Sequence, residues 1–158
     1  MRQVLYVFAA FLLTDPAIAQ NLRASEPEAI VKKMIDMGYK AKLDELEGDP
    51  VIDSASGGSS FSLLFNGCDK GKQCDVVTFF DVYSFKKENY VSMRQFVDKW
   101  NSEHYTKTEI TDDSIYITFP VIMNYEGLGP NLFQSNFDTW ILELSDFRKK
   151  VADADKNK

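Results

Sequence analysis

The chain has 158 residues, with 24 acidic side chains against 18 basic ones and a formal net charge of −6. An acidic protein repels phosphate backbones and anionic lipid surfaces, and no cluster of basic and aromatic residues offsets this repulsion. We therefore expect no nucleic-acid partner and no adhesion to an anionic membrane surface.

Residues 1–19 have the pattern of a signal peptide. After a positively charged start, the run from Val4 to Leu13 is apolar, and Ala17 and Ala19 form a small-x-small cleavage site. The apolar run is too short to cross roughly 30 Å of hydrocarbon, which argues against a membrane anchor. We expect cleavage after Ala19, so that the protein is periplasmic or secreted.

The remaining chain has the length of a single domain. We expect this domain to cover residues 20–151, followed by a disordered charged tail over residues 152–158. No stretch after the signal peptide is apolar enough to predict a membrane span.

The first predicted element of the domain is a helix. Ser25 and Glu28 have the spacing of a capping box, and Pro27 suits the first turn of a helix. Gly38 stands where a C-terminal cap is expected. Between these signals the apolar residues recur at helical spacing, at Ile30, Val31, Met34 and Ile35.

Four stretches after this helix have the alternation or the apolar content of β-strands. They cover residues 39–43, 51–55, 61–65 and 76–83. The last stretch is apolar on both faces, and such a strand needs cover on both sides. We expect helices on one face and loops or a partner chain on the other, which predicts a homodimer.

The second half of the chain predicts a helix, a hairpin and a final helix. An apolar stripe over residues 93–100 has helical spacing, and residues 105–110 and 114–123 form the hairpin. Pro120 has no backbone N–H to donate to a neighbouring strand, so it marks an edge or a bulge of the sheet. The final helix runs from Pro130 to Val151. The order α-βββ-β-α-ββ-α predicts an α+β fold in which helices flank an antiparallel sheet.

The two cysteines of the chain, Cys68 and Cys74, predict a disulfide bond. An even number of cysteines at short separation is typical of an exported, oxidised protein. The competing interpretations are a metal pair and a redox dithiol. The five-residue spacing suits neither of these, and no histidine lies nearby in the sequence.

The G-x-S-x-G and H-E-x-x-H motifs are absent from the sequence, and we expect no catalytic residue, no cofactor and no metal site. His104 is the only histidine and follows a predicted helix, where a capping or surface role is expected. A small hydrolase whose carboxylates converge only in the fold stays an alternative. A deep pocket lined by acids would favour it, and a shallow open sheet face would count against it. The acidic cluster in question contains Asp44, Glu45, Glu47, Asp49 and Asp53.

Several runs of the chain resemble the YbjN family, in its exported and cysteine-containing branch. The longest are the run from Gly48 to Ala55 and the run from Phe61 to Cys68. The resemblance extends over roughly residues 27–151. It is supported by Met34, Gly38 and Tyr39 near the first helix end, by Trp100 and Asn101, and by Phe133, Phe137, Trp140 and Leu144.

This resemblance implies a fold similar to that of type III secretion chaperones and a role as a bacterial sensory transduction regulator. We expect a non-enzymatic periplasmic protein that binds an unidentified protein partner, as a chaperone-like module or stress regulator. A further alternative is a secreted enzyme inhibitor that uses the Cys68–Cys74 loop, with Lys70 and Lys72, as its contact.

Overall fold

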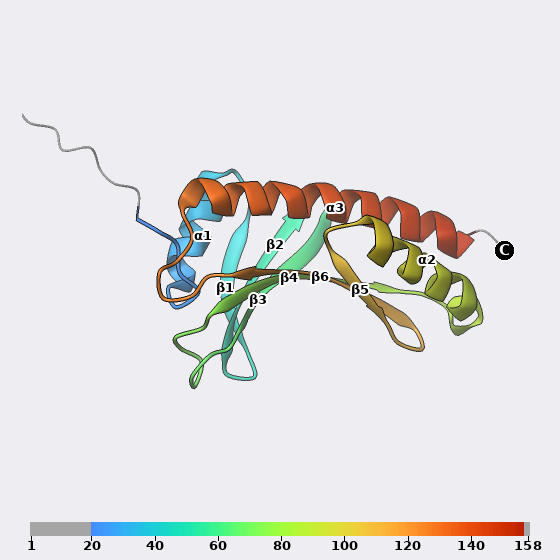
Figure 1. Cartoon of the computed structure of the whole chain (residues 1–158), viewed down its shortest axis with the longest axis horizontal. Helices are drawn as coiled ribbons and strands as arrows, with labels where there is room; N and C mark the ends of the chain where they lie inside the picture. Colours follow the sequence, from blue (N-terminus) through green and yellow to red (C-terminus); the bar gives the residue numbers. More distant parts are fainter. Residues whose placement is uncertain (1–19, 157–158) are drawn as a thin grey trace, which may run out of the picture.

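The computed structural model describes residues 20–156, so the predicted signal peptide lies outside the described part of the chain. Residues 20–156 form a six-stranded antiparallel sheet in the order β1-β2-β3-β4-β6-β5. The helices lie together on one side of it (Figure 1). The strands are β1 (Ala41–Leu46), β2 (Asp49–Ser56), β3 (Ser59–Asn66), β4 (Val76–Ser84), β5 (Lys107–Ile110) and β6 (Ser114–Ile122). The helices are α1 (Pro27–Asp36), the short 3-10 helix η1 (Lys87–Asn89), α2 (Tyr90–Glu103) and α3 (Pro130–Lys156).

The α+β class and the order of elements confirm the prediction from sequence. Two tight turns hold β1, β2 and β3 together as a meander. Glu47 and Gly48 join β1 to β2 with φ angles of 54° and 94°, and Gly57 and Gly58 join β2 to β3 with 61° and 82°. Positive φ at both central residues is typical of hairpin turns whose twist matches that of the strands.

The long helix α3 supplies most of the cover for the inner face of the sheet. Trp140 stacks on Phe79 of β4 with 5.7 Å between ring centroids, and Phe61 of β3 meets Trp140 edge-on at 5.9 Å. Burial of such large aromatic side chains is a main source of stability in a domain of this size. The buried residues of α3 are Phe133, Phe137, Trp140, Leu144, Phe147 and Val151. Within residues 20–156, no helix is long and apolar enough to cross a bilayer.

The predicted disordered tail is wrong for residues 152–156, which form the last turns of α3. Asp155 holds this end of the helix in place. Its carboxylate accepts hydrogen bonds from the side-chain amide of Asn89 at 2.6 Å and from the hydroxyl of Tyr83 at 3.1 Å. Partners that are distant in sequence therefore order a segment whose composition alone suggests fraying. Residues 157–158 lie outside the described part of the chain.

The predicted capping box at the start of α1 is also wrong. Glu26 is the N-cap residue, without a side-chain cap, and it accepts a bond from Arg23 at 3.2 Å, while Ser25 is exposed. Just before the helix, Leu22 pairs with Leu128 through two backbone hydrogen bonds of 2.8 and 2.7 Å. This tertiary pairing fixes the path of the chain into α1 and overrides the local signal.

Pro120 lies where the sequence predicts an edge. It pairs with Thr78 of β4, whereas β5 pairs with β6 only up to the pair of Lys107 and Thr118. The end of β6 therefore has a neighbouring strand on one side only, which is where a residue without an N–H is tolerated.

Candidate protein-binding surface

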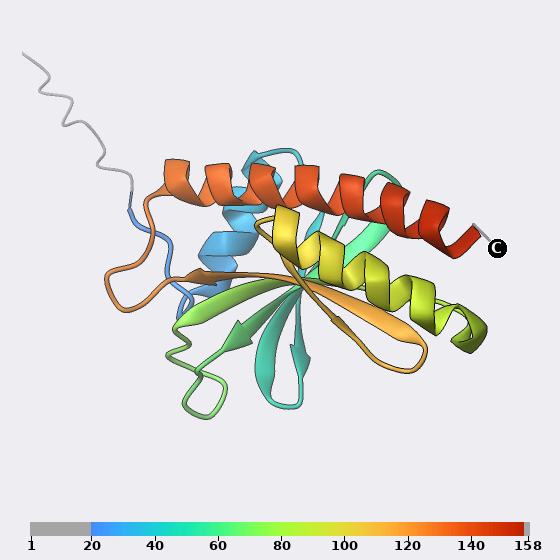
Figure 2. The same cartoon turned by 45° about the vertical axis from the view of Figure 1, so that its right-hand side comes forward.

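The sheet has an open face, on the side opposite to the helices (Figures 1 and 2). Side chains alternate between the two faces of a strand. In β4, Val77 and Phe79 are buried against the helices, and Phe80 and Val82 point the other way. The register places the following residues on the same open face: Val51, Leu64, Val76, Thr78, Tyr116, Thr118, Pro120 and Ile122.

The centre of the open face is apolar and partly exposed to solvent. Phe80 of β4 stacks on Tyr116 of β6 with 5.9 Å between ring centroids. Val82, which pairs with Tyr116, is 45% exposed, and Ile122, at the other end of β6, is 72% exposed. Apolar side chains that are left exposed on one face of a folded protein often mark an interaction site.

The rim of the open face carries charged and polar groups that are satisfied locally. Lys42 pairs with Asp44 on β1 at 2.6 Å, and Ser62 donates to Asp53 on β2 at 2.9 Å. The hydrogen bond between Lys42 and Asp44 raises the pKa of the lysine and lowers the pKa of the carboxyl. Lys107 and Glu109 of β5 stand at the opposite rim. An apolar centre with a polar rim is the usual anatomy of a protein interface.

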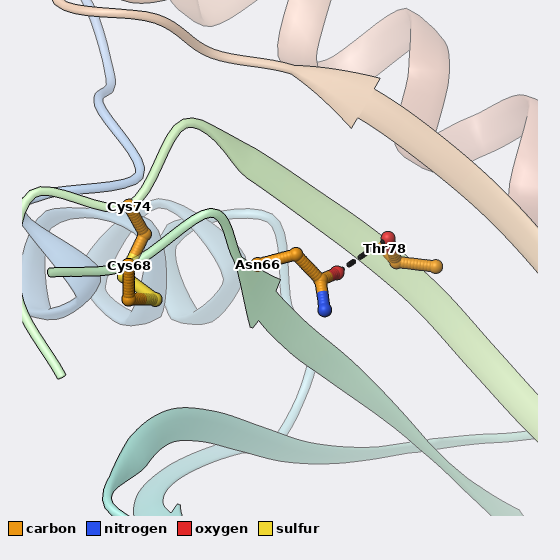
Figure 3. The surroundings of a disulfide bond; sticks show 4 residues. All are labelled: Asn66, Cys68, Cys74 and Thr78. Atoms are coloured by element: carbon orange, nitrogen blue, oxygen red, sulfur yellow. Dashed lines mark hydrogen bonds between the residues drawn. A yellow bond between two sulfur atoms is a disulfide. The ribbon is translucent and has the colours of Figure 1, made fainter. Parts of the chain in front are cut away.

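The predicted disulfide between Cys68 and Cys74 is present and closes a loop between β3 and β4 (Figure 3). The loop lies at the end of the open face, where the Thr78 hydroxyl donates to the Asn66 side chain at 2.8 Å. Gly71 in the loop packs directly on the carbonyl of Gly48, so closely that a Cβ at position 71 would overlap it. The loop that the disulfide closes is therefore packed against the β1–β2 turn.

Residues 27–153 match the model of the YbjN family, whose description is "Putative bacterial sensory transduction regulator". The chain belongs to the YbjN family. A crystal structure of YbjN, described as a putative transcription regulator from E. coli, has a similar fold, with a TM-score of 0.54 and 9% sequence identity. That similarity covers 82% of this chain and 96% of the other. No match is found among curated proteins.

The predicted acidic cluster of this YbjN-family protein is not buried as a catalytic pair of carboxyl groups would be. A hollow of about 370 Å³ between α1, the β1–β2 hairpin and the disulfide loop is lined by Glu28, Asp44 and Glu45, which are all exposed. A general acid requires a desolvated carboxyl with a raised pKa, whereas Lys42 lowers the pKa of Asp44. The predicted cluster is spread over both faces of the hairpin and its turn, at Asp44, Glu45, Glu47, Asp49 and Asp53.

His104 has the capping position that the sequence predicts, because it is the C-cap residue of α2. Its ring stacks on Trp100 with 3.6 Å between centroids, and its Nδ1 lies 3.1 Å from the Glu143 carboxylate of α3. The Thr106 hydroxyl donates to the same carboxylate at 2.9 Å and accepts from the Trp100 indole at 3.0 Å. These contacts join α2 to α3. Within residues 20–156, no three His, Cys, Asp or Glu side chains come together as a metal site.

The sequence reveals only part of the open face. The two apolar faces of β4 are visible in its run of residues, but the contribution of β6 is missed. The buried residues of β6 occupy every second position so regularly that its sequence resembles that of a strand with only one buried face. The missed signal is that the residues between them are also largely apolar, at Tyr116, Pro120 and Ile122.

Proposed function

We propose that this YbjN-family protein is an exported, non-enzymatic regulator that acts by binding other proteins through the open face of its sheet. The observation that carries the proposal is that apolar side chains along this face are exposed, from Val82 near one end of the central strands to Ile122 at the other. Leaving such residues in water is unfavourable, and a protein partner would bury them. The family description as a sensory transduction regulator agrees with a protein that signals through contacts.

Export is supported by the signal-peptide pattern of residues 1–19 together with the disulfide. Structural disulfides persist in oxidising compartments and are rare in the cytosol. The Cys68–Cys74 bond fixes the loop at the end of the open face. The proposed place of action is therefore the periplasm or the medium, where this bond is maintained.

A non-enzymatic role is supported by the state of the candidate catalytic groups. The carboxylates that line the hollow between α1 and the β1–β2 hairpin are exposed, and His104 is engaged by Glu143 and Trp100. The proposal includes the chaperone-like activity that the resemblance to type III secretion chaperones implies.

The proposal is tested by affinity capture from envelope extract with three baits of the mature, oxidised chain. The baits are the wild type, Ile122→Lys on the open face, and Leu142→Lys on the outer side of α3. Leu142 is a matched control because it has the same 72% exposure as Ile122. We expect the wild type and the Leu142 variant to capture the same stoichiometric partner and the Ile122 variant to lose it. Equal capture by all three baits would contradict binding at the open face.

A further inference from the structure

We infer that the open face of one copy binds the open face of a second copy, about a two-fold axis that crosses the strands between Thr78 and Phe80. The inference rests on the proposed function in taking the open face as a protein-binding surface. It adds the identity of one occupant and the geometry of the complex.

The size of the open face suits a stable dimer. Six strands at a spacing of about 4.8 Å span about 24 Å, and the nine residues of β4 and of β6 extend about 30 Å. The face therefore has an area of roughly 700 Å², close to the roughly 800 Å² per partner of a standard interface. Two sheets can pack face to face at about 10 Å with their apolar side chains interdigitated.

The register of β4 and β6 makes the face self-complementary about an axis across the strands. Along β4, Val76 and Val82 lie at equal distances on either side of the midpoint between Thr78 and Phe80. The axis therefore places Val76 of one copy over Val82 of the other. Along β6, Ile122 pairs with Val76 and Tyr116 pairs with Val82. The same axis thus covers the exposed Ile122 with Tyr116 of the second copy, and each half repeats these contacts, as two-fold symmetry requires.

The charged rim is compatible with the same axis. Lys42 and Asp44 are neighbours on the open side of β1. Rotation about an axis across the strands places Lys42 of one copy opposite Asp44 of the other. The charges at this edge are then complementary between copies, which favours this orientation over others.

A two-fold axis along the strands is disfavoured by the same register. Lys42, Asp53, Ser62, Phe80, Thr118 and Lys107 form one row across the sheet. An axis along the strands would superpose the two ends of this row, so that Lys42 would face β5 of the second copy instead of Asp44. It would also place β6 over β2 of the second copy, with Ile122 against the carboxylate of Asp49. A desolvated carboxylate opposes association.

Sedimentation velocity over a roughly thousandfold concentration range tests the dimer by mass action. We expect the mature, oxidised wild type and Leu142→Lys to form dimers with the same dissociation constant. Ile122→Lys buries an ammonium group against Tyr116 of the second copy and should raise that constant by at least about a hundredfold. Ile122 is exposed in the single chain, so the circular dichroism spectrum should be unchanged.

The geometry is tested by cross-linking mixed single-cysteine variants. Within residues 20–156 the native cysteines are both in the disulfide, so only the introduced thiol reacts. Opposed Cβ atoms in packed sheets are about 7 Å apart, which a short bismaleimide can span. We expect efficient cross-linking of Ile122→Cys with Tyr116→Cys, and only background with Leu142→Cys. Efficient linking of Ile122→Cys with Asp49→Cys would overturn the axis across the strands.

A wild type that stays monomeric over the whole concentration range would overturn the inference, and so would an Ile122→Lys variant that dimerises like the wild type. Neither result decides the proposed function, because capture of a different protein by the open face is measured separately. A monomer that captures a partner through Ile122 would retain the proposed function without the dimer.

Discussion

Arg148 of α3 binds Asp81 of β4 with 2.9 Å between the guanidinium and the carboxylate. The same guanidinium donates to the backbone carbonyls of Ser56 at 3.2 Å and Ser60 at 2.6 Å, on either side of the β2–β3 turn. One side chain thus fastens the long helix to two parts of the sheet. Both partners are largely buried, so the pair is shielded from the solvent screening that weakens surface ion pairs.

Replacement of Arg148 by methionine should destabilise the fold. Arg148→Met keeps much of the apolar stem but leaves the Asp81 carboxylate largely buried without its cation, at a cost of about 2–4 kcal/mol in the free energy of unfolding. Urea unfolding checks this value. The double variant Arg148→Met with Asp81→Asn should recover part of the loss, because the uncompensated charge is removed. A single variant as stable as the wild type would contradict the role given to the pair.

Asp81 should give the stability of the protein a specific pH dependence. Burial raises the pKa of the Asp81 carboxyl above its ordinary value of 3.8, and the neighbouring Arg148 offsets only part of this effect. The folded state therefore binds the proton more tightly than the unfolded state does. The contribution of Asp81 to the stability of the fold is largest below the pKa that its carboxyl has in the unfolded state. This contribution is lost as the pH rises through the pKa of the folded state.

The direction of this pH dependence is tested by measuring the unfolding of the wild type and of Asp81→Asn over a range of acidic pH values. The free energy of unfolding of the wild type, relative to the variant, should fall as the pH rises from below 3.8. A relative stability that rises over this window would show that Arg148 dominates over burial.

Reduction of the disulfide should lower the stability without unfolding the domain. A chain-entropy treatment of a seven-residue loop gives a loss of about 2.4 kcal/mol. The measurement compares thermal unfolding of the oxidised protein with that of a Cys68→Ser, Cys74→Ser double variant. Intact mass after alkylation of the wild type should show no free thiol, and labelling of both cysteines in the exported protein would contradict the bond.

Export predicts a defined N-terminus. Protein recovered from the periplasm should begin at Gln20, and a lysine in place of Leu12 within the apolar run should retain the uncleaved chain in the cell. Intact mass spectrometry measures both outcomes. A full-length chain in the cytoplasm of wild-type cells would contradict the proposed location.

The sequence predicts the elements whose apolar patterns are long and regular, and it misses features that depend on distant contacts. The stripe of α3 and the two-sided pattern of β4 are each visible within a single run of residues. The extension of α3 to Lys156 depends on Asn89 and Tyr83, and the start of α1 depends on the pairing of Leu22 with Leu128. Neither relationship leaves a local signal in the sequence.

The open face likewise has one feature that the local sequence predicts and one that depends on distant contacts. A strand that is apolar on both sides predicts that the second side needs cover, and this requirement is visible in Val76 to Tyr83. The register that brings Tyr116 and Ile122 of β6 next to this strand is set by a long connection through α2 and β5. The composition of the open face therefore became visible only with the fold.

Thiol accessibility at two matched positions tests the central claim most directly. Ile122→Cys and Leu142→Cys are expressed at the natural level of the protein, and maleimide labelling rates are measured in fresh cell extract before and after denaturation. Because both native side chains are 72% exposed in the single chain, the two thiols should react at similar rates if nothing covers them. We predict that the thiol at position 122 is protected in the native extract and that the thiol at position 142 is not. Equal native rates at the two positions would contradict the claim that the open face binds protein.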